Sequence, residues 1–252
     1  MNETIKTIQS LRTIHGDFSE QKIHEKDLEA ILNAAVHAAT ASARQSYSII
    51  VISDKKKMQQ LCEYKADKLL VFCVDFARII EIAKHLGHEF NICDTIGFIT
   101  GSADTVLAAQ TACIAAKSLG IDSMFTQRGL HRRDIAKVFK ILDLPNKHCF
   151  PLLGLYLGYP RTEPEFQKGR LAGTGVIHWD KYHRLSLEEK NALVLEYDDK
   201  KKNLGLTDNW HQEGIKHYLD WFYLKWAQQV DTTQITNMLK TVDFLPKNEK
   251  NE

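Results

Sequence analysis

Residues 103–119, ADTVLAAQTACIAAKSL, limit how this chain can fold more than any other stretch, because as a helix they are apolar almost all round. Such a helix must be covered on every side. Gly120 follows it and is typical of a glycine that caps the end of a helix. The chain therefore needs other elements, or a second copy of itself, to enclose this helix.

Strands and helices alternate over the first two thirds of the chain. Short apolar or β-branched runs predict strands, and apolar residues that recur every three or four positions predict helices. Strands are expected over residues 47–52, 69–74, 122–126 and 151–158. Helices are expected over residues 4–11, 26–39, 77–86 and 134–142. This alternation predicts a central sheet covered by helices on both faces.

The C-terminal part is predicted to be mostly helical from residue 181 onward and includes the aromatic stretch 210–226. Only 5 prolines occur in the chain, and neither a repeat nor a linker marks a boundary. We therefore expect one domain over residues 1–252, with 181–252 as a helical extension that packs on the domain or on a partner subunit. The apolar helix and the aromatic stretch offer more apolar surface than a small sheet covers, which predicts an obligate homodimer.

Composition excludes several classes of protein. The chain has 252 residues, and its 33 Lys and Arg against 32 Asp and Glu give a net charge of +1, which argues against a nucleic-acid binder. A hydrophobic content of 44% argues against disorder. No apolar run approaches the roughly 20 residues of a membrane span, and residues 1–10 lack a signal-peptide core. We expect a soluble, cytoplasmic protein.

The cysteines and histidines do not form a recognisable metal or disulfide pattern. The cysteines occur singly and far apart, and three of them lie in or beside apolar runs, as free core cysteines do. They are Cys62, Cys73, Cys93, Cys113 and Cys149. His85 and His88 are spaced as neighbours on a helix, but closing ligands are not evident. We therefore predict neither a disulfide framework nor a metal site.

Familiar catalytic and nucleotide-binding motifs are missing as well. The first strand is not followed by GxGxxG, and GxxxxGK[ST] does not occur, which disfavours the dinucleotide fingerprint and the P-loop. Without GxSxG, serine hydrolase chemistry lacks support.

Three short patterns point instead to a ligand-binding site. Residues 11–15, LRTIH, combine a guanidinium, a hydroxyl and an imidazole. Residues 40–45, TASARQ, place small hydroxyl residues between an apolar helix and a strand, where they can donate to a ligand. Lys168-Gly169-Arg170 can clamp a phosphate, with arginine as a fork and lysine as a point charge. Each pattern alone is typical of an ordinary surface loop, so their joint order carries the interpretation.

In that order, the chain resembles the nitroreductase family of FMN-dependent oxidoreductases. Within the family it is most similar to the larger, NADPH-preferring nitroreductase and flavin reductase group. The resemblance runs roughly from residue 8 to residue 171. It rests most on GSADTVLAAQTACIAAKSLGIDSMF and PLLGLYLGYP, supported by LRTI, TASARQSYSIIVISD, LLVFCVDFAR, LDLP and QKGRL.

The resemblance implies an α+β fold with a mixed central sheet covered by helices. It also implies an intertwined homodimer that holds two FMN molecules at its interface. The implied activity is FMN-dependent NAD(P)H oxidation, in which flavin N5 carries hydride in a ping-pong cycle to nitro-compounds, quinones or flavins. The cofactor supplies the chemistry, so no side chain is expected to act as a nucleophile. The alternative is a non-catalytic FMN-binding or redox-sensing protein on the same fold.

The resemblance also assigns FMN contacts to individual residues. Lys168 and Arg170 match the pair that grips the FMN phosphate. The other matching positions are Arg12 and Thr13 in the N-terminal motif, Thr40, Ser42 and Gln45 beside the flavin, and Thr126, Gln127 and Gly129 in the loop that passes N5.

The chain departs from the family pattern at several of these places. Leu11 stands where the family usually has Arg or His, and His15 stands where it usually has Arg or Lys near the flavin pyrimidine. The loop before the second strand is shortened, and the Gly-Gly of the N5 loop is replaced by Gln127-Arg128-Gly129. Arg132 and Arg133, or Lys200–Lys202, could hold the extra phosphate of NADPH and predict a preference for it; alone, these residues are also typical of a solvated surface.

Overall fold

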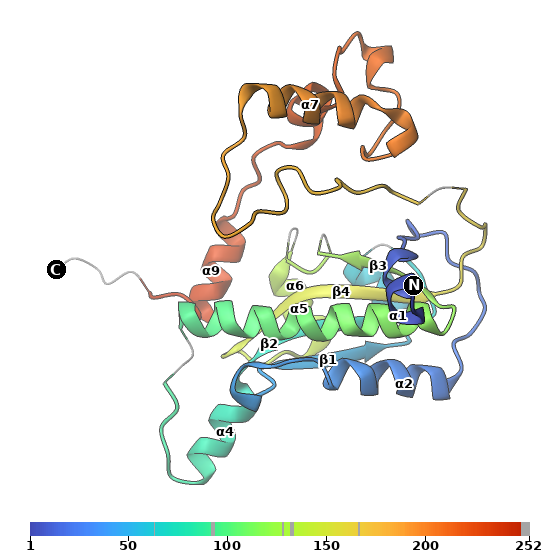
Figure 1. Cartoon of the computed structure of the whole chain (residues 1–252). Coiled ribbons are helices and arrows are strands. Elements are labelled where there is room, and N and C mark those ends of the chain that lie inside the picture. Colours follow the sequence, from blue (N-terminus) through green and yellow to red (C-terminus); the bar gives the residue numbers. More distant parts are fainter. Residues whose placement is uncertain (63, 92–93, 128, 132–133, 166, 248–252) are drawn as a thin grey trace, which may run out of the picture. The chain divides into compact units, whose positions relative to one another are not determined.

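The computed structural model describes residues 1–62, 64–91, 94–127, 129–131, 134–165 and 167–247 (Figure 1). The chain divides into two compact units. We call Met1–Glu163 with Thr232–Glu252 the core unit, and Pro164–Asp231 the insertion unit. Among the described helices, none has both the length and the apolar character that a bilayer crossing requires.

The core unit has an α+β fold, as the sequence predicts. Its strands are β1 (Tyr47–Ile52), β2 (Lys68–Asp75), β3 (Asp122–Thr126) and β4 (Cys149–Gly158). Its helices are α1 (Glu3–Gln9), α2 (Glu25–Val36), α3 (Lys55–Cys62), α4 (Ala77–His85), α5 (Thr95–Ser118), α6 (Ile135–Leu142) and α9 (Thr233–Thr241), and a short 3-10 turn, η1 (Ala41–Ala43), precedes β1.

The four strands form one sheet in the order β1-β2-β4-β3, and all neighbours pair antiparallel. Within the described residues, parallel pairing is confined to the isolated bridge between Thr13 and Ser123, on β3. The two edge strands have the predicted bounds. The two central strands are longer than predicted, because Lys68 and Asp75, whose polarity suggested strand ends, still pair with Leu157 and Cys149.

Helices cover both faces of the sheet, which confirms the predicted layers. The alternation of side chains along β2 assigns the two faces: Leu70 and Phe72 join the apolar cluster of α2 and α5, whereas Leu69 and Val71 join the cluster of α3 and α6. Figure 1 shows α5 as the longest helix, lying across the sheet beside α2.

Helix α5 begins at Thr95, eight residues before the predicted start at residue 103. Asp94 caps it by accepting a hydrogen bond of 2.8 Å from the Gly97 amide. Gly101 looks like a helix breaker in the sequence, yet a Cβ at this position would lie 2.7 Å from Cγ1 of Val74. Glycine is therefore what allows α5 to approach the sheet this closely, and the packing outweighs its poor helix propensity.

Helix α3 was not predicted, because its lysines suggested only a solvated surface. Asp54 starts the helix by accepting hydrogen bonds from the Lys56 and Lys57 amides at 2.7 and 3.0 Å, and these bonds lower the pKa of Asp54. Met58 and Leu61 then point into the core at helical spacing. Two apolar residues in one short helix give too weak a periodicity to recognise from sequence.

The insertion unit is built from short helical segments, in line with the prediction of a mostly helical C-terminal part. They are α7 (Leu187–Asp198), η2 (Lys200–Lys202), η3 (Trp210–Glu213), α8 (Tyr218–Trp221) and a π-helical turn, η4 (Phe222–Trp226). Tyr218 is buried at their centre, with its ring 5.8 Å from that of Tyr197 and 5.7 Å from that of Trp210. That residues 181–252 pack on a partner subunit stays a prediction.

Candidate functional site

The N-terminal segment 11–15 lies along the outer edge of β3. Thr13 bridges Ser123, and the Ile14 amide donates to the Ser123 carbonyl at 3.1 Å. Ile14 is buried, so its neighbours Thr13 and His15 point outward and are exposed. Leu11 is half-buried against the cluster formed by α2 and α5. The segment thus offers the Thr13 hydroxyl and the His15 imidazole to a ligand.

Arg12 is held by two carboxylates rather than left open for a ligand. Its Nε and Nη2 donate to Asp122 over 2.6–3.1 Å, and its Nη1 and Nη2 donate to Glu163 at 2.5 and 3.1 Å. Lys117 Nζ donates to Asp122 at 2.7 Å. Burial alone would raise the pKa of Asp122, but the hydrogen bonds from Arg12 and Lys117 hold it below its ordinary value. Arg12 anchors the segment, and its contact with FMN stays a prediction.

The segment 40–45 forms a tight loop before β1. The Thr40 hydroxyl donates to Asp104 at 2.7 Å and accepts from the Gln45 amide at 2.9 Å. The Gln45 side chain donates to the Val36 carbonyl at 3.2 Å. Ser42 lies at the exposed tip of the loop. Of the three predicted contacts, Ser42 is therefore the side chain best placed to meet a ligand.

Thr126 and Gln127 line a hollow of about 450 Å³ at the end of β3. Its other lining residues are Val106, Ala109 and Gln110 of α5, Phe125 of β3 and Leu153 of β4. Gly129 lies in the turn that follows, where the Leu130 amide donates to the Gln127 carbonyl at 3.1 Å. The hollow combines an apolar floor with amide and hydroxyl groups and has the size of a small-molecule site.

Lys168 and Arg170 belong to the insertion unit. Lys168 Nζ donates to Asn203 Oδ1 at 2.8 Å and to the Gly205 carbonyl at 2.5 Å. Arg170 Nη1 donates to the carbonyls of Lys168 and Gly169 at 3.0 and 2.8 Å. A Cβ on Gly169 would lie 1.9 Å from the Lys202 carbonyl oxygen, so only glycine fits between the two cations. Neither cation has a carboxylate partner within the described residues.

The predicted residues of the core unit fall into two separate groups. Thr126 ends β3 and Thr13 bridges Ser123 of the same strand, whereas residues 40–45 lead into β1, and β1 and β3 are opposite edges of the sheet. Three strand spacings separate these edges, about 14 Å. Helix α5 contacts both groups. Asp104 bonds to Thr40 of the first group, and Lys117 bonds to Asp122, the partner of Arg12, in the second; the two α5 residues are 13 positions or about 20 Å apart.

The sequence interpretation missed the carboxylates that hold both groups. Asp104 and Asp122 are 2% and 3% exposed, and neither was singled out. One signal was available for Asp104, because it is an isolated acid in an otherwise apolar helix, and a buried acid needs dedicated donors. Arg128, Arg132, Arg133 and Cys93, which entered the predictions above, lie outside the described residues.

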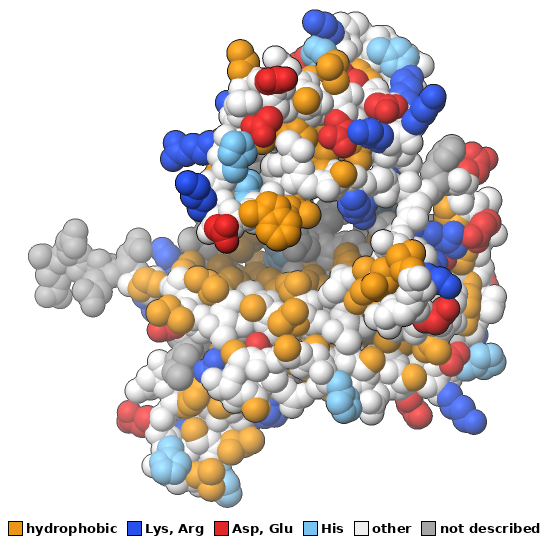
Figure 2. Space-filling view, in the orientation of Figure 1, with side chains coloured by type: hydrophobic (Ala, Val, Ile, Leu, Met, Phe, Trp, Pro, Cys, Tyr) orange, Lys and Arg blue, Asp and Glu red, His pale blue; other side chains and the backbone are white. Residues whose placement is uncertain are grey.

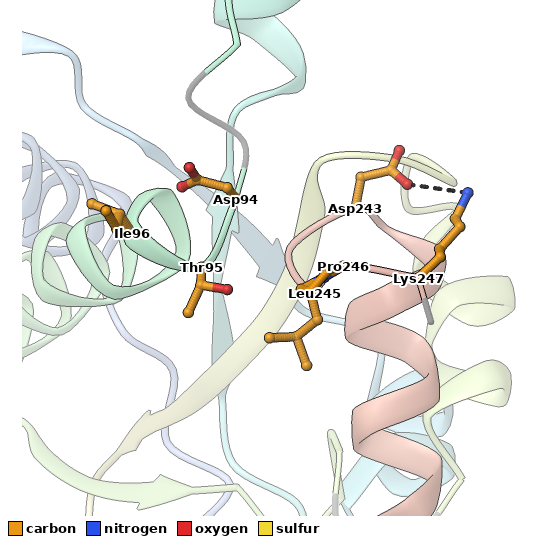
Figure 3. Close-up of a pocket in the computed structure, with 7 residues that line it drawn as sticks. All are labelled: Asp94, Thr95, Ile96, Asp243, Leu245, Pro246 and Lys247. Carbon is orange, nitrogen blue, oxygen red and sulfur yellow. Dashed lines mark ion pairs between the residues drawn. The ribbon is translucent and has the colours of Figure 1, made fainter. Parts of the chain in front are cut away.

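A larger hollow, of about 650 Å³, lies elsewhere in the core unit, where α5 begins and the chain leaves α9 (Figure 3). Asp94 and Asp243 lie on it, with Lys247 paired to Asp243 at 3.5 Å. None of the predicted FMN contacts lines it.

Comparison with known proteins identifies the family. The sequence model of the nitroreductase family matches residues 8–159. The chain belongs to the nitroreductase family, and the predicted resemblance is confirmed.

The relatives and structural neighbours of this chain carry the names of the same kind of enzyme. The chain is 28% identical over 229 residues to FMN reductase (NADPH) of Bacillus subtilis, which covers 84% of this chain and 90% of the relative. It is 32% identical to the oxygen-insensitive NADPH nitroreductase of Salmonella typhimurium, covering 82% and 84%. The crystal structure of the NADPH:FMN oxidoreductase from Vibrio harveyi with NAD+ superposes with a TM-score of 0.79 at 26% identity, covering 98% of this chain and all of that one.

Proposed function

We propose that this protein is an FMN-dependent NAD(P)H oxidoreductase that reduces nitro-compounds, quinones or flavins. The observation that carries the proposal is the hollow between α5 and β3. Val106, Ala109, Phe125 and Leu153 give it an apolar surface, while Gln110, Thr126 and Gln127 provide hydrogen-bonding groups. A flat heteroaromatic ring needs this combination of an apolar face and a polar edge, so the residues present fit FMN.

When bound, FMN supplies the hydride chemistry that links the nicotinamide donor to the acceptor. The residues of this chain bind and orient it. The apolar side chains of the hollow offer a surface to the ring, and the Thr13 hydroxyl and His15 imidazole face outward from the segment that runs beside β3. In the insertion unit, Lys168 and Arg170 supply the cations that a phosphate requires.

We further infer that the site is completed by a second copy of the chain. The predicted contacts lie at opposite edges of one sheet, which supports a ligand bound between the β3 edge of one protomer and the 40–45 loop of its partner. The outer face of α5 supports the same arrangement. Its exposed apolar residues follow a helical spacing, and Ile96, Ile99, Val106 and Leu107 are 70%, 64%, 47% and 46% exposed. Figure 2 shows hydrophobic side chains along this helix.

Anaerobic titration of the purified protein tests the function. We expect the protein to carry FMN, and we expect NADPH to bleach its visible absorbance and an added quinone to restore it. NADH in parallel measures the preference between the nucleotides. A protein that holds FMN but is not bleached by either nucleotide supports the non-catalytic alternative. A protein that takes up no FMN contradicts the proposal.

The phosphate clamp is tested by changing Lys168 and Arg170 together to Ala. Each lost charge-assisted hydrogen bond costs about 1.5–3 kcal/mol, so the FMN dissociation constant should rise by about a hundredfold or more. Changing Lys190 and Lys216, exposed lysines of the same unit, to Ala removes the same charge and should leave FMN affinity intact. Equal affinity in both double variants would remove the clamp from the site.

A further inference from the structure

The carboxylate of Asp104 accepts hydrogen bonds from one loop, residues 40–46. Oδ2 accepts from the Thr40 hydroxyl at 2.7 Å and from the Ser46 amide at 3.3 Å, and Oδ1 accepts from the Ala41 amide at 2.8 Å. Asp104 is 2% exposed, and within the described residues it has no cationic partner. A buried charge of this kind is tolerated only because dedicated donors replace its hydration. All three donors come from residues 40–46.

The same loop holds a backbone that side chains with a Cβ rarely adopt. Ser42, Ala43 and Gln45 have φ angles of 53°, 54° and 51°, in the left-handed region. Such conformations persist only when the surroundings impose them, and they are concentrated at ligand-binding sites. Three within four residues therefore require a cause outside the loop.

Two side chains hold this conformation, one from α5 and one from α4. Asp104 holds the start of the loop at Ala41, and through the Thr40 hydroxyl it also holds the Gln45 amide. Arg78 of α4 donates to the Gln45 carbonyl at 2.7 Å. The Thr40 hydroxyl, the Ala41, Gln45 and Ser46 amides and the Gln45 carbonyl are thus bonded to protein, while Ser42 and Ala43 stay exposed at the tip of the loop.

We propose that Asp104 is a positioning residue that holds loop 40–46 in its left-handed conformation, so that the exposed tip at Ser42 is already shaped to contact FMN. This inference rests on the proposed function. Asp104 itself does not touch the cofactor. Its contribution is to order the loop before binding, so that FMN affinity does not bear the entropy of ordering it.

The test compares Asp104→Asn with Asp67→Asn. Asp104→Asn keeps the shape of the side chain but replaces one acceptor oxygen by an NH₂ group, which points a donor at the donors of the loop. Asp67 is a matched control, because it is 1% exposed, accepts from the Ile23 amide at 3.0 Å and pairs with Lys22 at 2.9 Å, outside the predicted contacts. Release of FMN from each holoenzyme on dilution, followed by free flavin fluorescence, gives the dissociation constant, and circular dichroism with saturating FMN gives Tm.

We expect Asp104→Asn to raise the FMN dissociation constant about tenfold or more, as for an unpaired buried donor. Asp67→Asn should lower Tm but keep the dissociation constant within about twofold. An unchanged constant in Asp104→Asn, or an equal rise in both variants, overturns the inference. Wild-type protein that binds no FMN contradicts the proposed function instead.

Thr40→Val keeps the test decisive if Asp104→Asn folds poorly, and Ala43→Gly tests the role of the loop conformation directly. Thr40→Val removes the hydroxyl between Asp104 and Gln45 but leaves the carboxylate, and it should also weaken FMN binding. Ala43→Gly makes the left-handed conformation freely accessible. Added to Asp104→Asn, it should recover part of the lost affinity. Unchanged affinity in Thr40→Val, or no recovery with Ala43→Gly, contradicts a role through loop conformation.

Discussion

At the scale of single residues, two buried carboxylates hold the two groups of predicted FMN contacts. Asp104 accepts hydrogen bonds from the loop before β1, and Asp122 holds the segment 11–15 beside β3 through its ion pair with Arg12. In both cases the residue predicted to bind the ligand, Thr40 or Arg12, bonds to the carboxylate in this structure. Ligand contact then falls to the exposed neighbours of these residues, such as Ser42 and Thr13.

Changing Arg12 to Ala should destabilise the protein by about 3 kcal/mol, because it leaves the buried Asp122 with one partner fewer. Arg12 also forms an ion pair with Glu163, whose side chain is 72% exposed. Glu163→Gln removes the charge of this second partner and should cost less than about 1 kcal/mol of stability. Urea unfolding of the two variants measures both free energies. Equal losses would show that the Arg12–Asp122 pair is not an anchor.

The depressed pKa of Asp122 predicts how this anchor depends on pH. Because the folded state favours the carboxylate, the pair contributes stability above the unfolded pKa of about 3.9. That contribution is lost as pH falls through the lower, folded pKa. The difference in unfolding free energy between wild type and Asp122→Asn should therefore be greatest near neutral pH and shrink below about pH 4. A difference that stays constant on acidification would contradict the assignment.

At the scale of elements, the contact between α5 and β2 places Asp104 and the hollow. Gly101 sets how closely the helix approaches the sheet, since a Cβ there would lie 2.7 Å from Val74 and 3.0 Å from Phe76. The alanines of α5 continue the close contact, and Ala108 and Ala112 are fully buried. The small residues of this helix thus fix the position of the polar residues that it carries.

Gly101→Ala should destabilise the protein even though alanine is the better helix former. The gain in helix propensity is about 1 kcal/mol, whereas overpacking against Val74 and Phe76 costs about 1–3 kcal/mol. Ala103→Gly, at an exposed position of the same helix, isolates the propensity effect and should cost about 1 kcal/mol. Urea unfolding decides the sign, and a stabilised Gly101→Ala would refute the close contact.

At the scale of the whole molecule, the apolar outer face of α5 and the division of the site between two sheet edges both call for a second chain. We expect Ile99→Lys to prevent formation of the proposed homodimer and to release FMN, because it places a charge in the proposed interface. Gln59→Lys, on the exposed side of α3, introduces the same charge away from α5. Light scattering at micromolar concentration measures the mass of each. A monomeric wild type that retains FMN would contradict the shared site.

From the sequence alone, the four strands, most helices of the core unit, the layered α+β fold and the family could be predicted. It could do so because apolar spacing and glycine punctuation act between near neighbours, as in the strand 47–52 and the cap at Gly120. Ordered motifs such as LGLYLGYP identified the family and, with it, the predicted FMN contacts.

The folded structure shows which of these residues already bond to other protein groups and how they divide between the two edges of the sheet. Arg12 meets Asp122 across 110 positions, and Thr40 meets Asp104 across 64. The start of α5 likewise depends on the contact of Gly101 with Val74. Sequence spacing cannot reveal such pairs, because their energy comes from burial and hydrogen bonds between residues that only the complete fold brings together.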